Sequence, residues 1–196
     1  MRILLASVAL LLTATTAPAA TLNVVGGQLL GASDIDVGGQ LYDVDFLDGT
    51  CIALFRECDS AADFTFTFTT ANDAVLAAQA LLDQVFLDSV AGPFDTSPSR
   101  TAGCPRPGFC LVFIPYDVDV TLFAPILIAG AWNGTLEWRD SAFDGVDAFF
   151  SSNTFGDGDS KVWAVWTLVP EPTPALFTLL GLAGLGCARR AKPSQR

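Results

Sequence analysis

The chain has 196 residues, 21 of them acidic and ten basic, and its formal net charge is −11. This acidity argues against binding to DNA or RNA backbones, which requires basic patches. The chain contains no histidine, which excludes Ser-His-Asp and Cys-His catalysis and histidine metal sites.

The N-terminus has the pattern of a secretory signal peptide. Arg2 precedes an apolar core, Ile3–Leu12, and small residues follow that core. Cleavage after Ala19 or Ala20 fits the small-residue rule. A signal anchor is the alternative, but the apolar core is short for a membrane span. We therefore assign residues 1–20 to a signal peptide.

Residues 21–168 are predicted to form one exported domain, which carries most of the charge. This part of the chain holds 20 acidic residues against five basic ones, a net of −15. Such a charge suits a soluble extracellular protein, or one that meets divalent cations. Aspartate greatly outnumbers glutamate, which favours turns and strand edges over long helices.

The domain opens with a pattern typical of β-structure over residues 22–48. The sequence Val-Gly-Gly-Gln-Leu occurs at residues 25–29 and again at 37–41. Each Gly-Gly pair predicts a turn or bulge between short strands. The residues after the second copy alternate, which places Tyr42, Val44 and Phe46 on one face of a strand.

A strand and a helix are predicted next. Residues 64–69 alternate phenylalanine and threonine, which indicates a strand. The period then changes, and the apolar residues between Asn72 and Val90 fall on one helical stripe. Asn72 can cap this helix, and the following Gly92-Pro93 ends it. We expect the helix to cover the aromatic face of the sheet. The stripe consists of Val75, Leu76, Ala78, Leu82, Val85 and Phe86.

The second half of the domain is predicted to contain further strands. Residues 94–108 are rich in proline, serine, threonine and glycine and indicate a loop. Strands are predicted at 110–115, 118–123, 126–132, 135–138 and 161–168, with an irregular segment at 140–159. The whole pattern predicts a β-rich α+β domain in which one amphipathic helix packs on an antiparallel sheet.

Four of the five cysteines lie in the predicted exported domain, where an even set indicates disulfides. Three pairings of four cysteines are possible. The close spacings favour Cys51–Cys58 and Cys104–Cys110. A zinc site with four thiolates is the alternative, but the spacings are not Cys-x-x-Cys.

Asp-x-Asp pairs are the most suggestive candidates for chemistry. Positions two apart on a strand share a face, so each pair can place two carboxylates side by side for Ca²⁺. Asp157 and Asp159 flank a glycine and are the best local candidates, although solvated strand or turn residues are the simpler interpretation. Paired carboxylates can also hydrolyse glycosides. The pairs are Asp34/Asp36, Asp43/Asp45, Asp117/Asp119 and Asp157/Asp159.

The four tryptophans are candidates for stacking on sugar rings. Core or strand-face packing is the more common role of tryptophans at such spacings. They are Trp132, Trp138, Trp163 and Trp166.

The C-terminus combines three parts. Residues 169–172, with the sequence Val-Pro-Glu-Pro, precede an apolar run that ends at Ala188, and the chain closes on a basic end. The run predicts a transmembrane helix at about 174–188, which is short, because a full span needs roughly 20 apolar residues. The basic residues Arg189 and Arg190 should stay cytoplasmic. A buried core helix is the alternative.

This arrangement resembles the PEP-CTERM sorting signal of Gram-negative bacteria, over Val169 to Arg190. Tails of that family are processed by exosortase, a membrane cysteine protease. The resemblance implies a sorting tail at 169–190 and a basic cytoplasmic end at 191–196. It also implies removal or exchange of the helix during export. The recognition site would be Val169, Pro170, Glu171 and Pro172. Residues 41–51 also look like exported domains that carry such tails.

We therefore expect an exported surface or extracellular-matrix protein without catalytic activity or cofactor. It would be anchored in the inner membrane facing the periplasm, and then reach the cell surface or the medium. The resemblance implies exosortase as a partner and makes exopolysaccharide a plausible one. The alternatives are a secreted carboxylate-dependent glycan hydrolase and a Ca²⁺-stabilised carbohydrate-binding module.

Overall fold

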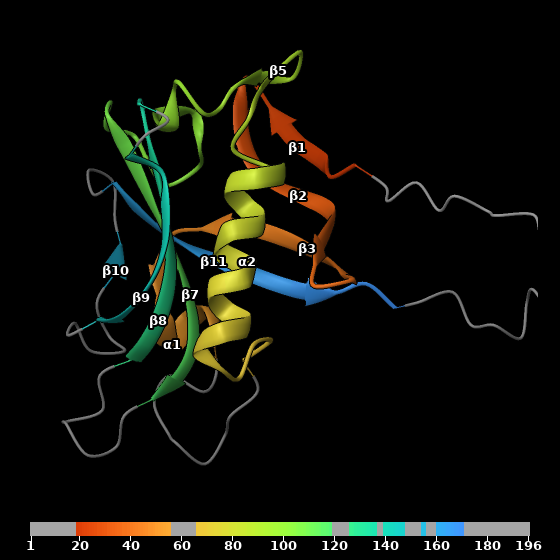
Figure 1. The fold of residues 1–196 in the computed structure, drawn as a ribbon. Coiled ribbons are helices and arrows are strands. Elements are labelled where there is room, and N and C mark those ends of the chain that lie inside the picture. Colours follow the sequence, from red (N-terminus) through yellow and green to blue (C-terminus); the bar gives the residue numbers. More distant parts are fainter. Residues whose placement is uncertain are drawn as a thin grey trace, which may run out of the picture.

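A seven-stranded sheet with one long helix across it forms the fold (Figure 1). The computed structural model describes residues 19–55, 66–118, 126–136, 139–147, 154–155 and 160–170. The strand order is β1-β2-β3-β11-β7-β8-β9. The predicted β-rich α+β class is therefore confirmed. The strands are β1 (Thr21–Val25), β2 (Gln28–Val37), β3 (Gln40–Leu47), β7 (Phe109–Val118), β8 (Ile126–Gly134), β9 (Ser141–Asp147) and β11 (Lys161–Leu168).

The long helix α2 and several short elements connect these strands. Two small two-stranded sheets pair β4 with β10 and β5 with β6. The remaining elements are β4 (Gly49–Thr50), α1 (Cys51–Leu54), α2 (Ala71–Gln84), β5 (Asp88–Ser89), β6 (Gly92–Pro93), η2 (Pro98–Arg100) and β10 (Thr154–Phe155).

The repeated Gly-Gly pairs form the turns of an N-terminal meander. Gly26 and Gly27 join β1 to β2 with φ of 61° and 82°, and Gly38 and Gly39 join β2 to β3 with 63° and 90°. Two consecutive positive φ values match the twist of antiparallel strands, and glycine adopts them without steric cost. The predicted turns are confirmed.

β11 lies at the centre of the sheet, between two meanders. It pairs antiparallel with β3 and parallel with β7. The prediction of a wholly antiparallel sheet is therefore wrong, because the sheet is mixed at the β11–β7 pair. The reason lies in the topology. The inner edges of the two meanders are β3 and β7, which run in opposite directions, so a strand that pairs with both is antiparallel to one and parallel to the other.

α2 crosses one face of the sheet and contacts β2, β7, β8 and β9 (Figure 1). Its cap is Thr70, whose Oγ1 accepts the Asp73 N–H at 3.2 Å and donates to the Asp73 carboxylate at 2.8 Å. The helix ends at Gln84, because the chain then turns into the β5–β6 hairpin. The predicted start at Asn72 is close, and the predicted end at Val90 is wrong.

Alanines, more than large side chains, bring α2 onto the sheet. Ala74, Ala77 and Ala78 are fully buried, and such small side chains allow a close approach. Leu76 is 53% exposed, so its place on the predicted buried stripe is wrong. Val85 and Phe86 are buried as predicted, but they follow the helix.

Both faces of β11 are buried. Val162, Ala164 and Trp166 belong to a core on the α2 side, which we call the helix-side core. Trp163 points to the other face, because successive strand residues alternate. There it joins Cys51, Phe66, Phe113, Val118, Ile126 and Ile128 in what we call the opposite core.

The predicted strand at 64–69 is wrong over its described part. Residues 66–70 form no strand, and Phe66 packs in the opposite core while Phe68 packs in the helix-side core. Thr67 Oγ1 donates to the Trp166 carbonyl oxygen at 2.8 Å. The segment cannot pair as a strand with β3 or β11, because both edges of each are already occupied.

Two further differences concern the second meander. β7 runs through Val118, so the predicted break before that residue is wrong, and residues 119–123 lie outside the described ranges. β9 forms where an irregular segment was predicted. β9 lies at the sheet edge, where a charged residue such as Asp144 is tolerated and discourages further pairing. Thr135 and Leu136 form no strand.

The predicted signal peptide and transmembrane helix fall almost entirely outside the residues that the structure describes. Within the described ranges, no helix combines the length and the apolar character needed to cross a membrane.

Replacing Trp163 should strongly destabilise the domain. Trp163 is 1% exposed, contacts the rings of Phe55 and Phe113, and donates from Nε1 to the Gly49 carbonyl oxygen at 3.1 Å. We expect Trp163→Ala to lower the free energy of unfolding by about 3–5 kcal/mol. The exposed control Leu76→Ala should change it by less than about 0.5 kcal/mol. Urea denaturation measures both, and equal effects would contradict the burial of β11 on both faces.

Candidate functional site

The predicted sorting motif begins where the sheet ends. The Val169 N–H donates to the Leu41 carbonyl oxygen at 2.9 Å, so sheet bonding continues one residue beyond β11. Pro170 has no N–H and cannot extend this bonding. Glu171, Pro172, Arg189 and Arg190 lie outside the described residues.

Both ends of the described domain lie at the same end of the sheet. The alternating directions of β1, β2, β3 and β11 place the start of β1 and the end of β11 at the same end of the sheet, with β2 and β3 between them. Figure 1 shows the start of β1 and the end of β11 on the same side of the molecule.

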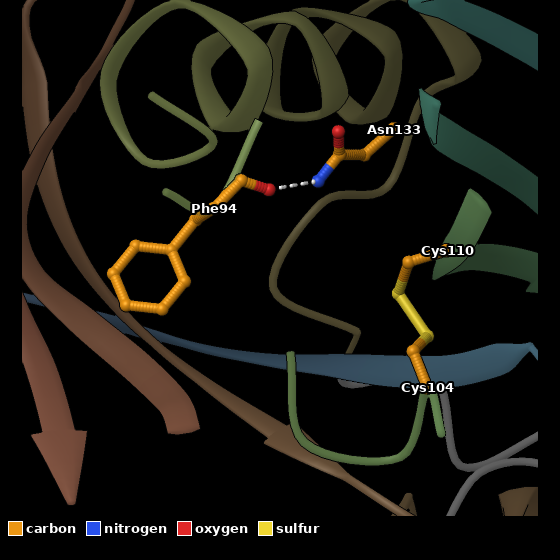
Figure 2. The surroundings of a disulfide bond; sticks show 4 residues. All are labelled: Phe94, Cys104, Cys110 and Asn133. Atoms are coloured by element: carbon orange, nitrogen blue, oxygen red, sulfur yellow. Dashed lines mark hydrogen bonds between the residues drawn. A yellow bond between two sulfur atoms is a disulfide. The ribbon is translucent and has the colours of Figure 1, made fainter. Parts of the chain in front are cut away.

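The predicted disulfide Cys104–Cys110 is confirmed. The two Cα atoms are 5.5 Å apart, and both residues are fully buried (Figure 2). The bond occupies two of the four sulfurs that the zinc alternative requires. Cys51 is also disulfide-bonded. Its predicted partner, Cys58, lies outside the described residues.

A buried asparagine ties the loop before η2 to β8. Figure 2 shows the Asn133 amide directed at the Phe94 carbonyl oxygen, and Nδ2 donates to that oxygen at 2.9 Å. Both residues are fully buried. Asn133 Oδ1 has no hydrogen-bond partner within the described ranges, which is the typical environment of a buried water. The role of this contact is structural.

The Asp-x-Asp carboxylates near the N-terminus bind backbone groups. Asp43 Oδ1 accepts the N–H of Asp34 at 3.1 Å, and Asp34 adopts a φ of 60° at a bulge in β2. Asp36 Oδ1 accepts the Gly39 N–H at 2.7 Å in the β2–β3 turn. Asp45 is exposed. These contacts favour turn and bulge roles for the two pairs.

The other pairs are only partly described. Asp117 Oδ1 accepts the N–H of Val118 at 2.7 Å, and Asp119, Asp157 and Asp159 lie outside the described residues. In the part of the chain that the structure covers, no three acidic or cysteine side chains are placed to hold a metal ion.

The tryptophans differ in exposure. Trp163 and Trp166 are 1% and 5% exposed, which favours packing over sugar stacking. Trp132 is half-buried and stacks on Phe109, with ring centroids 4.8 Å apart. Trp138 lies outside the described residues.

A mixed aromatic and polar cavity opens beside the β2–β3 turn. It has a volume of about 360 Å³, and we call it the Tyr42 cavity. The Tyr42 side chain is half-buried, and its ring centroid lies 5.1 Å from that of Phe68. The Phe68 ring centroid lies 5.5 Å from that of Trp166. Polar groups complete the lining. They are Gln40, Thr67, Thr69 and Asp73.

A second cavity, of about 320 Å³, is lined by three aspartates, and we call it the acidic cavity. Asp83 comes from α2, Asp95 from the loop after β6, and Asp140 from the residue before β9. Asp83 Oδ1 accepts from Gln79 at 2.9 Å, and Asp140 Oδ1 accepts the Gly134 N–H at 2.7 Å. None of the three belongs to a predicted Asp-x-Asp pair. They are far apart in the sequence, and only the tertiary fold brings them to one cavity.

Tyr116 is buried, and its hydroxyl group has a raised pKa. The Tyr116 hydroxyl donates to Asp144 Oδ1 at 2.7 Å, from β7 to the edge strand β9. Burial raises the pKa of Tyr116 well above its usual value, and the hydrogen bond to Asp144 and the charges of Asp144 and Asp117 raise it further. The neutral hydroxyl therefore serves as a donor that links two strands.

Comparisons with known proteins give no family. No family model matches the chain, and searches of curated proteins and of solved structures find no match either.

Tyr116 should make the domain sensitive to alkaline pH. Its pKa in the folded state lies above the unfolded value of about 10, so its contribution to stability is complete below pH 10 and falls as the pH rises further. We expect Tyr116→Phe to lose less stability between pH 8 and pH 11 than the wild type does. Urea midpoints at several pH values measure this difference, and parallel curves would contradict it.

Proposed function

We propose that this chain is an exported surface or extracellular-matrix protein that is sorted by its C-terminal tail and processed there by an exosortase-type enzyme. The proposal includes a leader at residues 1–20 and a membrane helix at about 174–188. It includes no catalytic activity. The motif itself, residues 169–172, carries the proposal.

The position of the motif supports the proposal. Val169 makes the last described sheet hydrogen bond, and Pro170, which has no N–H, cannot extend it. A processing enzyme would thus meet the motif at the boundary of the domain, and cleavage there would leave every strand intact. The Cys104–Cys110 disulfide fits an oxidising compartment outside the cytoplasm.

Substitution of the motif should abolish processing. The triple variant Pro170→Ala/Glu171→Ala/Pro172→Ala keeps Val169 and its hydrogen bond to Leu41, so the domain should stay folded. In a Gram-negative host with the processing enzyme, the wild type should end near residues 170–172, and the variant should keep Arg196. Mass spectrometry of the C-terminus distinguishes the two.

Pro174→Ala is the matched control, because it changes the same tail outside the motif. It should be processed like the wild type. Recovery of the wild type with an intact C-terminus would contradict the proposal, as would equal processing of the triple variant.

We propose, as a second function, that the Tyr42 cavity binds a neutral extracellular polysaccharide. An aromatic ring can stack on the apolar face of a sugar, while amide, hydroxyl and carboxylate groups bind its hydroxyls. The cavity combines Tyr42 with Gln40, Thr69 and Asp73. The excess of acidic residues in the domain favours neutral over anionic polymers, because like charges repel.

The repeat in the sequence supplies a matched pair of variants for this second function. Gln28 and Gln40 follow the two Gly-Gly turns at equivalent positions and are both exposed, but only Gln40 lines the cavity. Gln40→Ala should weaken binding by about 1 kcal/mol, or roughly fivefold. Gln28→Ala should leave it unchanged. Affinity electrophoresis in gels containing the host's purified neutral exopolysaccharide measures the effect, and equal migration of the two variants would contradict this site.

A further inference from the structure

The C-terminal end of α2 carries a negative charge for which the described part of the chain supplies no cationic partner. Asp83 is the penultimate residue of α2, and the last turn of the helix contains no basic residue. The carbonyl end of a helix is itself negative, so a carboxylate is unfavourable there. Among the described residues, no basic side chain forms an ion pair with Asp83, whose hydrogen-bond partner is the Gln79 amide at 2.9 Å.

The residues just before β1 line the same cavity as this carboxylate. Ala19, Ala20 and Asp83 line one cavity of about 510 Å³. Ala20 is half-buried and packs against the helix-side core, together with Leu22 of β1. The predicted cleavage site is therefore placed at this cavity by the packing of Ala20 and Leu22 against the helix-side core.

We propose that leader removal completes this site, because the new α-ammonium group binds Asp83 and the C-terminal end of α2. The inference rests on the export proposed above. Hydrolysis of the Ala19–Ala20 bond consumes one water, leaves a carboxylate on the leader, and leaves an α-amino group on Ala20. This amine is mostly protonated near neutral pH, because its usual pKa is about 7.7–8.0.

The uncut chain cannot make the same interaction. Before cleavage, residue 20 presents a neutral peptide N–H, whereas the cleaved chain presents a cation. The cation is attracted both by the Asp83 carboxylate and by the carbonyl end of α2. The ion pair thus forms only after processing.

The consequence concerns the stability of an edge strand. β1 is the outermost strand, and its sheet partner is β2 alone. Its residues alternate between exposed and half-buried, so few contacts resist local opening. An ammonium group held by Asp83 would fasten the free end of β1, and maturation would protect an edge that is otherwise open to pairing with other chains.

Two chains of residues 20–196 in the same detergent test this proposal. One has a free α-amine on Ala20, and the other has an Nα-acetyl group, which removes the charge and adds little bulk. Hydrogen exchange of the β1 amides, followed by mass spectrometry, is the readout. We expect acetylation to accelerate exchange in β1 by roughly threefold to tenfold, as the loss of one ion pair and one helix-end charge predicts.

Substitution of Asp83 identifies the partner of the amine. In Asp83→Asn, acetylation should have little further effect. In Asp45→Asn, which changes an exposed aspartate on β3, acetylation should have the full wild-type effect. The proposal is overturned if acetylation leaves β1 exchange unchanged, or if its effect persists in Asp83→Asn.

Failure of this inference is distinguishable from failure of the proposed export. The exchange experiment uses chains with a defined N-terminus and does not depend on cleavage in cells. N-terminal sequencing of the protein from its host tests cleavage directly, and the proposal requires a start at Ala20. An intact leader would overturn maturation of this site in cells even if the ion pair forms in the prepared chains.

Discussion

The position of β11 between β3 and β7 is the constraint on which the rest of the structure depends. Each meander consists of strands that are neighbours in sequence, and each would end at an open inner edge without β11. The central strand pairs with both edges and is buried at Val162, Trp163, Ala164 and Trp166, whereas its last two residues are exposed. Trp163 and Trp166 therefore enter separate cores on opposite faces of the sheet. One strand of eight residues thus unites the two meanders and anchors both cores.

Several aspartates of this acidic domain accept hydrogen bonds from backbone N–H groups. Asp36, Asp43 and Asp140 each accept a backbone N–H in a turn, a bulge or a loop. Asp88 does the same for the loop that follows it, and its hydrogen bonds with Thr96 and Asp95 lower its pKa. A carboxylate held by N–H groups needs neither a cation nor a metal to be stable as an anion. The abundance of aspartate is thus explained in part by the irregular backbone that it caps.

The predicted signal peptide and the predicted sorting tail attach at the same end of the sheet. The start of β1 and the end of β11 lie at the same end of the sheet. The motif at 169–172 begins with Val169, which makes the last described sheet hydrogen bond. Changes to either end segment would therefore leave the central strand in place. The Tyr42 cavity lies near the same end, since Tyr42 pairs with Leu168 in the sheet. Any ligand of that cavity would therefore be bound close to the tail.

Local patterns in the sequence determined the features that depend on neighbouring residues. These include the Gly-Gly turns, the strand alternation at Tyr42–Phe46, the existence of α2, the Cys104–Cys110 bond and the tail motif. Only the tertiary structure decided the features that depend on distant partners. Pairing of β11 with β7 makes the sheet mixed, Phe66 and Phe68 separate into two cores, and three aspartates from different elements line the acidic cavity. The reason is physical: a residue's turn or helix preference is encoded beside it, whereas its strand partners and burial are set by chain segments far away.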